Sequence, residues 1–286
     1  MRRVFIDSAL EQDFLNQGYV CVDFFSTEEL YAVKTLFNKH SNQLETPFHS
    51  SHFSKDRSYK KEVHAGIIDQ GRKKIGQLLM DYKPLFANFM VKKSGADTVM
   101  PLHADWTYVK EPDFCSVACW IPLVDTGPEN GSLGVIPGSH ALQTNLRGPR
   151  IPSPFHHTNS YLIETYGKIL SLKAGQAVIY DHRLLHFSPP NLSPTIRPAL
   201  NMVLVPAEAQ LFHYLCEEGQ TTAVLEYPVK DESFFLEYDH YEIPDQNQVV
   251  KQLYQEINPF SKAYLDSVLG VKKSKWASLL ARLGIG

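Results

Sequence analysis

The sequence predicts a mainly β protein in which antiparallel strands form a sandwich or barrel and helices flank it. Short β-prone runs recur between Pro84 and Pro206, and turn-forming residues separate them. Helical periodicity is concentrated before Pro84 and again near the end of the chain. With 286 residues, of which 43% are apolar, the chain can bury a large core. Short strands at this spacing are typical of antiparallel sandwiches and barrels.

The first forty residues predict a helix, an extended segment and a second helix. In residues 8–17 apolar side chains recur on one helical face, and Gly18 follows as a C-terminal stop. Residues 19–25 are rich in β-prone types. Ser26 is a suitable N-cap with acidic residues in the turn after it, so we expect the second helix to begin there.

The next stretch is polar and has no steady periodicity. Residues 41–72 are rich in Ser, His and Lys, and we interpret them as a long loop or lid, since long loops in compact domains tend to be functional or mobile. Residues 72–82 predict a helix that ends where the β-prone region begins.

The β-prone runs would form the core of the fold. They lie at residues 86–93, 98–109, 114–124, 132–136, 168–172, 176–181, 184–187 and 197–206. The stretch 210–244 mixes aromatic and acidic residues, and residues 245–269 predict a helix. A basic amphipathic pattern closes the sequence, GVKKSKWASLLARLGIG, which we interpret as a docked terminal helix rather than a membrane-surface helix.

These patterns predict one domain over residues 1–286. Its expected parts are a helical N-terminal part (1–82), a β core (about 84–206) and a C-terminal extension (207–286).

The composition excludes several classes of protein. The 28 Lys and Arg against 31 Asp and Glu give a formal charge of −3, which argues against a nucleic-acid partner. The four cysteines form no Cys-x-x-Cys pair, so we expect neither a disulfide framework nor a zinc knuckle. No apolar run is long enough for a transmembrane helix, and no signal peptide is evident. A reducing, cytoplasmic location is the expectation, and the oligomeric state stays open.

Three residues have the chemistry of a metal site. On a β-strand, positions i and i+2 share a face, so His103 and Asp105 can present a nitrogen and an oxygen to one point. His186 ends a second β-prone run just before a turn. Two histidines and one carboxylate leave other coordination positions open, as in non-haem Fe(II) oxygenases. A structural zinc site would instead need four protein ligands, usually with thiolates.

An arginine and a serine follow the last member of this triad in the sequence. Arg197 lies 11 positions after His186, and Ser188 lies two positions after it. A guanidinium binds a carboxylate through two parallel hydrogen bonds, and a serine hydroxyl can add a third donor. The pair therefore suits the far carboxylate of a dicarboxylate cosubstrate.

In combination these motifs resemble those of the phytanoyl-CoA dioxygenase family of Fe(II)/2-oxoglutarate oxygenases. The resemblance covers roughly residues 10–206. It is carried by the segment FLNQGYVCVDFFSTEEL, by His103-x-Asp105, by WIPLVD at 120–125, by ENGSLGVIPGSH at 129–140, and by His186-Phe187-Ser188 with Asn191 and Arg197.

The resemblance implies a double-stranded β-helix, also called a jelly-roll or cupin-like fold, with flanking helices. It implies that His103, Asp105 and His186 hold Fe(II), and that Arg197 and Ser188 hold the distal carboxylate of 2-oxoglutarate. Trp120 would line the pocket beside 2-oxoglutarate, although a core role is an equal alternative. The implied activity is that of a hydroxylase, which uses O2 to hydroxylate an unactivated C–H bond of a small or medium-sized molecule and releases succinate and CO2.

Several alternatives stay open. The chain could be a catalytically silent jelly-roll that binds a ligand, or a cupin-type dioxygenase that does not use 2-oxoglutarate. Desaturation and other oxidations would use the same ligands as hydroxylation. We interpret His182 as a solvated or hydrogen-bonded residue near the mouth of the site, and Lys92 as part of a solvated turn. The substrate itself is not predicted.

Overall fold

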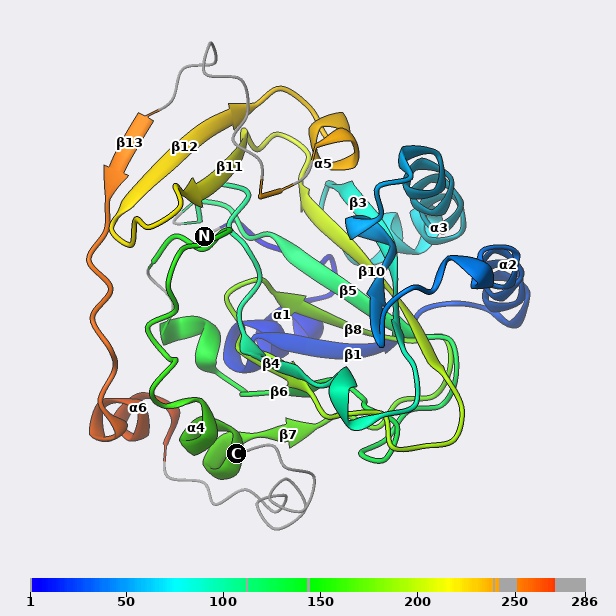
Figure 1. The fold of residues 1–286 in the computed structure, drawn as a ribbon, viewed down its shortest axis with the longest axis horizontal. Helices are drawn as coiled ribbons and strands as arrows, with labels where there is room; N and C mark the ends of the chain where they lie inside the picture. The colour runs from blue at the N-terminus through cyan, green and yellow to red at the C-terminus, as the bar shows by residue number, and fades with distance from the viewer. Residues whose placement is uncertain (1, 112, 143–144, 239, 242–250, 271–286) are drawn as a thin grey trace.

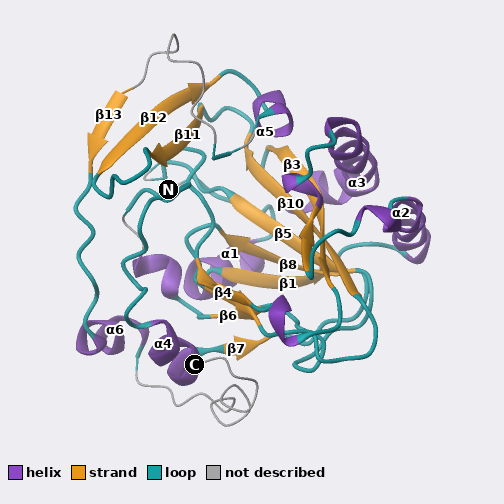
Figure 2. Ribbon diagram, viewed as in Figure 1, coloured by secondary structure: helices purple, strands orange, loops and turns teal. Residues whose placement is uncertain are grey.

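The computed structural model describes residues 2–111, 113–142, 145–238, 240–241 and 251–270, and its core consists of two antiparallel sheets (Figures 1 and 2). The larger sheet has six strands in the order β1 (Tyr19–Asp23), β8 (Gln176–Asp181), β5 (Val117–Pro122), β10 (Arg197–Pro206), β3 (Tyr82–Lys92) and β2 (Phe48–Ser50). The smaller has the order β4 (Met100–His103), β9 (His186–Ser188), β6 (Gly134–Val135) and β7 (Lys168–Ile169). The predicted mainly β jelly-roll with flanking helices is confirmed.

Helices cover the outer face of the larger sheet. The helices of the fold are α1 (Ser8–Gln17), α2 (Thr27–Lys39), α3 (Arg57–Leu78), α4 (Asn159–Tyr166), α5 (Ser233–Glu237) and α6 (Lys262–Leu269). Val33 of α2 and Ile67 of α3 belong to one buried cluster with Met202 of β10. Figure 1 shows α2 and α3 on the side of β3 and β10. Burial of this apolar layer fixes which face of β10 points to the interior.

The predicted start of α2 agrees with the structure. The Ser26 side chain accepts a hydrogen bond from the Glu29 amide, and the Glu29 carboxylate accepts one from the Ser26 amide, which makes a capping box. Gly18 adopts a left-handed conformation with φ 79° after α1, as its role as a stop requires.

The predicted loop over residues 41–72 is wrong in its second half, and the helix expected at 72–82 begins much earlier. α3 starts at Arg57, after the Asp56 side chain caps the amides of Ser58 and Tyr59. Much of α3 is polar, so its apolar positions are too sparse to give a periodic signal over the first two turns. Tertiary packing on β3, rather than propensity, stabilises this helix.

The C-terminal extension also differs from its predicted helix over 245–269. A third sheet joins β11 (Leu211–Cys216), β12 (Ala223–Val229) and β13 (Lys251–Tyr254), and only the last part of the stretch is helical, as α6. The basic amphipathic pattern at 271–286 lies outside the described residues. Among the residues that are described, no helix has the length and apolar character needed to cross a bilayer.

The register between β10 and β3 gives the interior of the fold its chemical pattern. Alternate residues of β10 pair with alternate residues of β3, and the side chains of these pairs, apart from Ala199, line the space between the two sheets. In order along the strands, the pairs are Arg197 with Lys92, Ala199 with Met90, Asn201 with Asn88, and Val203 with Phe86. The interior face therefore changes from cationic to amide to apolar over seven residues of β10.

A glycine in the smaller sheet sets the position of a residue next to His186. Gly134 of β6 pairs with Phe187 of β9, and a Cβ atom at Gly134 would lie 2.6 Å from the buried Phe187 ring. We expect Gly134→Ala to destabilise the protein by about 2 kcal/mol, because overpacking forces Phe187 to move. Urea unfolding monitored by circular dichroism measures the change in the free energy of unfolding. Gly76→Ala on α3, where a Cβ meets nothing within 4 Å, is the control and should not destabilise.

Candidate metal centre

Three side chains from the smaller sheet and the loop after β4 converge on one point. His103, Asp105 and His186 each offer a ligand atom, and these atoms lie within 4.8 Å of one another. His103 of β4 and His186 of β9 are cross-strand partners, with ring centroids 4.2 Å apart. The antiparallel pairing of two short strands therefore brings together residues that are 83 positions apart in the sequence.

Asp105 reaches this point by a route that differs from the prediction. β4 ends at His103, so Asp105 lies in a loop and not two positions further along a strand. Arg147 holds this loop, because its Nε donates to the Asp105 carbonyl at 2.7 Å and its amide donates to Thr107 Oγ1 at 3.1 Å. Arg147 also forms an ion pair with Glu111. The convergence is thus maintained by a buried arginine rather than by strand alternation.

Both histidines have one ring nitrogen engaged with the backbone. His103 Nδ1 lies 2.8 Å from the Pro101 carbonyl, and His186 Nδ1 lies 3.0 Å from the Leu184 carbonyl. A carbonyl oxygen only accepts, so in the neutral rings Nδ1 carries the proton and Nε2 carries the lone pair. Backbone carbonyls commonly orient metal-binding histidines in this way. Both Nε2 atoms are therefore available as ligands.

The electrostatics of the triad favour a bound cation. Burial and the nearby His103 lower the pKa of His186 to about 4, which keeps its imidazole neutral at physiological pH. Burial alone would raise the pKa of Asp105, but the imidazoles of His186, His182 and His103 outweigh it and the pKa is lowered. Asp105 Oδ2 is buried and has no hydrogen-bond partner among the described residues. Two imidazoles and a carboxylate with one unpartnered oxygen form a donor set that fits a divalent metal ion.

Two buried basic side chains lie in the same inner cavity as the triad. Arg197 is 2% exposed and Lys92 is 0% exposed, and both line this cavity with His186. Lys92 Nζ donates to the Ser188 carbonyl at 3.0 Å and to the Pro189 carbonyl. Within the described parts of the chain, no carboxylate lies within ion-pair distance of either cation. Two like charges buried together are costly unless an anion pairs with them.

Their pKa values show how strongly this environment opposes charge. Burial and the neighbouring Arg197 lower the pKa of Lys92 to about 6, and burial lowers the pKa of Arg197 to about 9. Without an anion, Lys92 is therefore mainly neutral at pH 7 while Arg197 remains charged. An arriving dicarboxylate would meet the permanent charge of Arg197 and the neutral amine of Lys92, which can take up a proton to become an ammonium.

The other two residues named from the sequence lie in the same inner cavity. Ser188 Oγ donates to the Gly131 carbonyl at 2.8 Å, so its hydroxyl is already engaged. Trp120 is 3% exposed, and its ring lies 5.4 Å from the Arg197 guanidinium carbon. The contact is a cation–π interaction, by which the indole holds the guanidinium in place.

Sequence reasoning missed the position of Lys92 and gave that of His182 in part, since His182 is hydrogen-bonded but buried rather than solvated. Lys92 is buried and points inward, not solvated in a turn, because it pairs with Arg197 across the two strands. His182 is 0% exposed, with Nδ1 3.1 Å from the Trp106 carbonyl and Nε2 3.9 Å from Asp105 Oδ2. The chain turns after Asp181, so His182 does not continue the strand that would have carried it away from His186.

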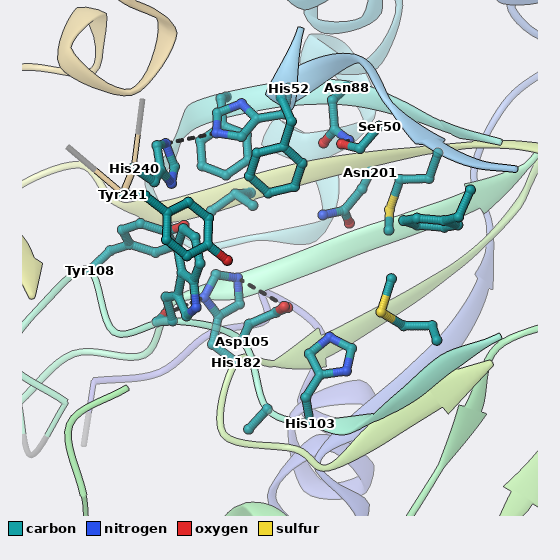
Figure 3. A pocket seen from close by; sticks show the side chains of 18 residues that line it. Ser50, His52, Asn88, His103, Asp105, Tyr108, His182, Asn201, His240 and Tyr241 are labelled. Carbon is teal, nitrogen blue, oxygen red and sulfur yellow. Dashed lines mark hydrogen bonds and ion pairs between the residues drawn. The ribbon is translucent and has the colours of Figure 1, made fainter. Parts of the chain in front are cut away.

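A second, larger cavity adjoins the triad on the other side. Its volume is about 360 Å³, and it shares His103, Asp105 and Asn201 with the inner cavity. Figure 3 shows His103, Asp105 and His182 at one side of this space, with Asn201, Asn88 and His52 across from them. The candidate metal centre therefore lies between a small cavity lined by Arg197 and Lys92 and a larger one sized for an organic molecule.

Solved structures with a similar fold include proteins described with 2-oxoglutarate. The carbocyclase SnoK from nogalamycin biosynthesis, described as non-heme and alpha-ketoglutarate-dependent, matches with a TM-score of 0.54 and 16% identity, over 72% of this chain and 86% of that one. EctD from S. alaskensis, solved with 2-oxoglutarate and 5-hydroxyectoine, matches with a TM-score of 0.52 and 20% identity, over 72% and 78%.

The fold and the donor set together define a class, the Fe(II)- and 2-oxoglutarate-dependent oxygenases, which use O2 as the oxidant. Within it, this chain belongs to the phytanoyl-CoA dioxygenase family, whose model matches residues 14–199. A curated relative, "Phytanoyl-CoA dioxygenase 1" of Oryza sativa subsp. japonica, is 26% identical over 216 residues, which is 65% of this chain and 74% of the relative. The resemblance seen in the sequence is confirmed.

Proposed function

We propose that this protein hydroxylates an unactivated C–H bond of a small or medium-sized organic molecule, with Fe(II) held by His103, Asp105 and His186. The observation that carries the proposal is the convergence of these three donor atoms within 4.8 Å, beside buried Arg197 and Lys92, which have no carboxylate partner among the described residues. Bound Fe(II) supplies the O2-dependent chemistry that converts 2-oxoglutarate to succinate and CO2 and oxidises the substrate.

The protein's own part is to bind and orient. Arg197 takes the distal carboxylate of 2-oxoglutarate through its paired N–H groups, and Trp120 keeps the guanidinium in position. Lys92 adds a second cation from the paired strand. Ser188 remains a predicted ligand, and its hydroxyl would have to turn away from the Gly131 carbonyl to donate to a carboxylate. The buried walls of the inner cavity limit access of water.

The choice of hydroxylation rests on the larger cavity and on Asp105. A carboxylate at this position occupies the place that halogenases of this kind leave open for chloride. EctD was solved with a hydroxylated molecule, which supports a hydroxylase, whereas SnoK is a carbocyclase on the same fold. Mass spectrometry of products made under 18O2 distinguishes the outcomes, because a hydroxylated product gains one labelled oxygen and a desaturated or cyclised product gains none.

The alternatives noted from the sequence predict different binding behaviour. A silent jelly-roll has no need for an open triad, and a cupin-type dioxygenase has no need for Arg197 and Lys92 in the cavity next to the metal. Adding Fe(II) and 2-oxoglutarate without O2 should produce the weak visible charge-transfer band of the chelate. Absence of this band in the intact protein would overturn the proposal. Release of succinate on admitting O2 would exclude the silent alternative.

The lowered pKa of Lys92 predicts that binding of 2-oxoglutarate is coupled to proton uptake. The pKa of Lys92 is about 6 without an anion, and a bound carboxylate raises it because it stabilises the ammonium. Between pH 6 and the raised value, the complex therefore holds a proton that the free protein lacks, and affinity should fall as pH rises through this window. Calorimetry at pH 7.5 in buffers of different ionisation enthalpy should show uptake approaching one proton.

Lys92→Met should abolish this uptake while leaving weaker binding through Arg197. Lys93→Met is the matched control, because Lys93 is the next residue along the chain but does not line the inner cavity. Equal enthalpies in all buffers for the unsubstituted protein would contradict the assigned role of Lys92.

A further inference from the structure

The larger cavity has few charged groups in its wall. Among the described side chains that line it there is no Lys, Arg or Glu, and its one Asp, Asp105, belongs to the donor set. The two histidines at its far end, His52 and His240, are buried, and burial lowers the pKa of His52 to about 3. A charged group bound there would lose its hydration without gaining a counterion. The wall thus disfavours both anions and cations.

Cationic side chains do occur nearby, but they line a different cavity. Lys55, Arg57 and Lys60 surround a space that shares only His52, Phe53 and His240 with the larger cavity beside the metal. His52 Nε2 and His240 Nε2 are 2.7 Å apart, so the two rings form a continuous part of this shared wall. The cations therefore do not change the charge of the space next to the triad.

Flat apolar groups make up much of the remaining lining. The His52 and Phe86 rings stack with centroids 4.0 Å apart, and Tyr108 meets Phe86 edge to face at 6.0 Å. Trp106 and Tyr241 meet edge to face at 5.9 Å. Such surfaces bind an apolar body, preferably a flat or ring-shaped one.

One polar atom in this lining has no partner. Asn201 is 9% exposed, and its Oδ1 atom is buried without a hydrogen bond among the described residues. Its cross-strand neighbour Asn88 cannot supply one, since the Asn88 amide nitrogen already donates to Ser50 Oγ at 3.0 Å and to the Phe89 carbonyl at 3.3 Å. Figure 3 shows Asn201 across the space from Asp105. A buried acceptor of this kind is costly unless a donor reaches it.

The opposite side of the space is formed by His182 and Asp105. His182 Nδ1 lies 3.1 Å from the Trp106 carbonyl, and His182 Nε2 lies 3.9 Å from Asp105 Oδ2, so these two side chains face one another. Asn201 Oδ1 is an amide oxygen and can only accept, so a molecule that fills the space satisfies it by donating a hydrogen bond.

We propose that the substrate is an uncharged molecule with an apolar, ring-containing body and an O–H or N–H group, and that Asn201 Oδ1 determines specificity by accepting that group's hydrogen bond. This inference rests on the proposed function, and it assigns a substrate class to the larger cavity. Asn201 is a specificity-determining residue: it holds the substrate and takes no part in proton or electron transfer.

Four probes of one size test the proposal: benzyl alcohol, toluene, benzoate and benzylammonium. Their affinities are measured by ligand-detected NMR on Zn(II)-loaded protein with 2-oxoglutarate, where Zn(II) stands in for Fe(II). Benzyl alcohol should bind tightest. Asn201→Leu should weaken benzyl alcohol about fivefold to tenfold and leave toluene unchanged, because only the alcohol loses a hydrogen bond. Val203→Ala, at the next inward-facing position of β10, should weaken benzyl alcohol and toluene equally.

The outcomes separate this inference from the proposed function. If benzoate binds best, or if Asn201→Leu affects alcohol and toluene alike, the substrate assignment is overturned, and a bound water is then the partner of Asn201. If Asn201→Leu weakens 2-oxoglutarate instead, the residue belongs to the cosubstrate site. Should the Fe(II)–2-oxoglutarate band not form, the proposed function fails, yet the same titrations on the metal-free protein still decide the role of Asn201.

Discussion

Replacing Arg197 with Leu is expected to raise the dissociation constant of 2-oxoglutarate about 100-fold. The guanidinium is buried, has Nε unpartnered, and would make paired charge-assisted hydrogen bonds to the distal carboxylate. Loss of hydrogen bonds to a charged group costs about 3 kcal/mol, which corresponds to this factor. Anaerobic titration of the charge-transfer band with 2-oxoglutarate gives the constant directly.

The same substitution should not destabilise the protein in the absence of cosubstrate. A buried cation without a counterion is unfavourable, so an apolar side chain of similar size should leave the melting temperature unchanged or raise it. Arg197→Lys keeps a charge but loses the planar fork, and should show an intermediate loss of affinity. Arg57→Leu, at an exposed position, is the control. Undiminished 2-oxoglutarate affinity in Arg197→Leu would remove this residue from the proposed site.

Replacing His186 or Asp105 with Ala should abolish iron retention. Changes to residues that only orient metal ligands cost about 10–100-fold in affinity, so loss of a ligand should exceed this range. Iron content after desalting, together with the charge-transfer band, measures the effect. We expect turnover, followed as succinate release, to fall below the detection limit because it depends on the bound metal.

A histidine outside the site provides the control for this experiment. His156 is exposed in the loop before α4, and His156→Ala should keep both iron and turnover. Far-ultraviolet circular dichroism checks that each variant is folded. If His186→Ala retains one iron per chain with the same band, the metal lies elsewhere and the proposed ligand set is wrong.

The sequence predicted the fold class and the candidate donor set because both depend on local pattern. The β-prone run that forms β10 and the turn after β9 are visible as residue types, and so is the spacing of His103 and Asp105. α3 was missed at its start because its stability comes from packing on β3. Lys92 was missed because its burial depends on pairing with Arg197 across 105 positions of sequence, which no local window contains.

The order in which the lining of the larger cavity occurs along the chain has a consequence for how enzymes of this fold diversify. Asn201, Val203, His240 and Tyr241 all line the larger cavity, and all follow residue 199, where the match to the family ends. The donor triad and the cation pair lie entirely before that point. Because β10 continues to Pro206, the family match ends inside a core strand, and the rest of that strand and the segments after it complete the chamber rather than the ligand set. Variation in this later part of the chain therefore offers relatives a route to new selectivity without changes to the donor residues.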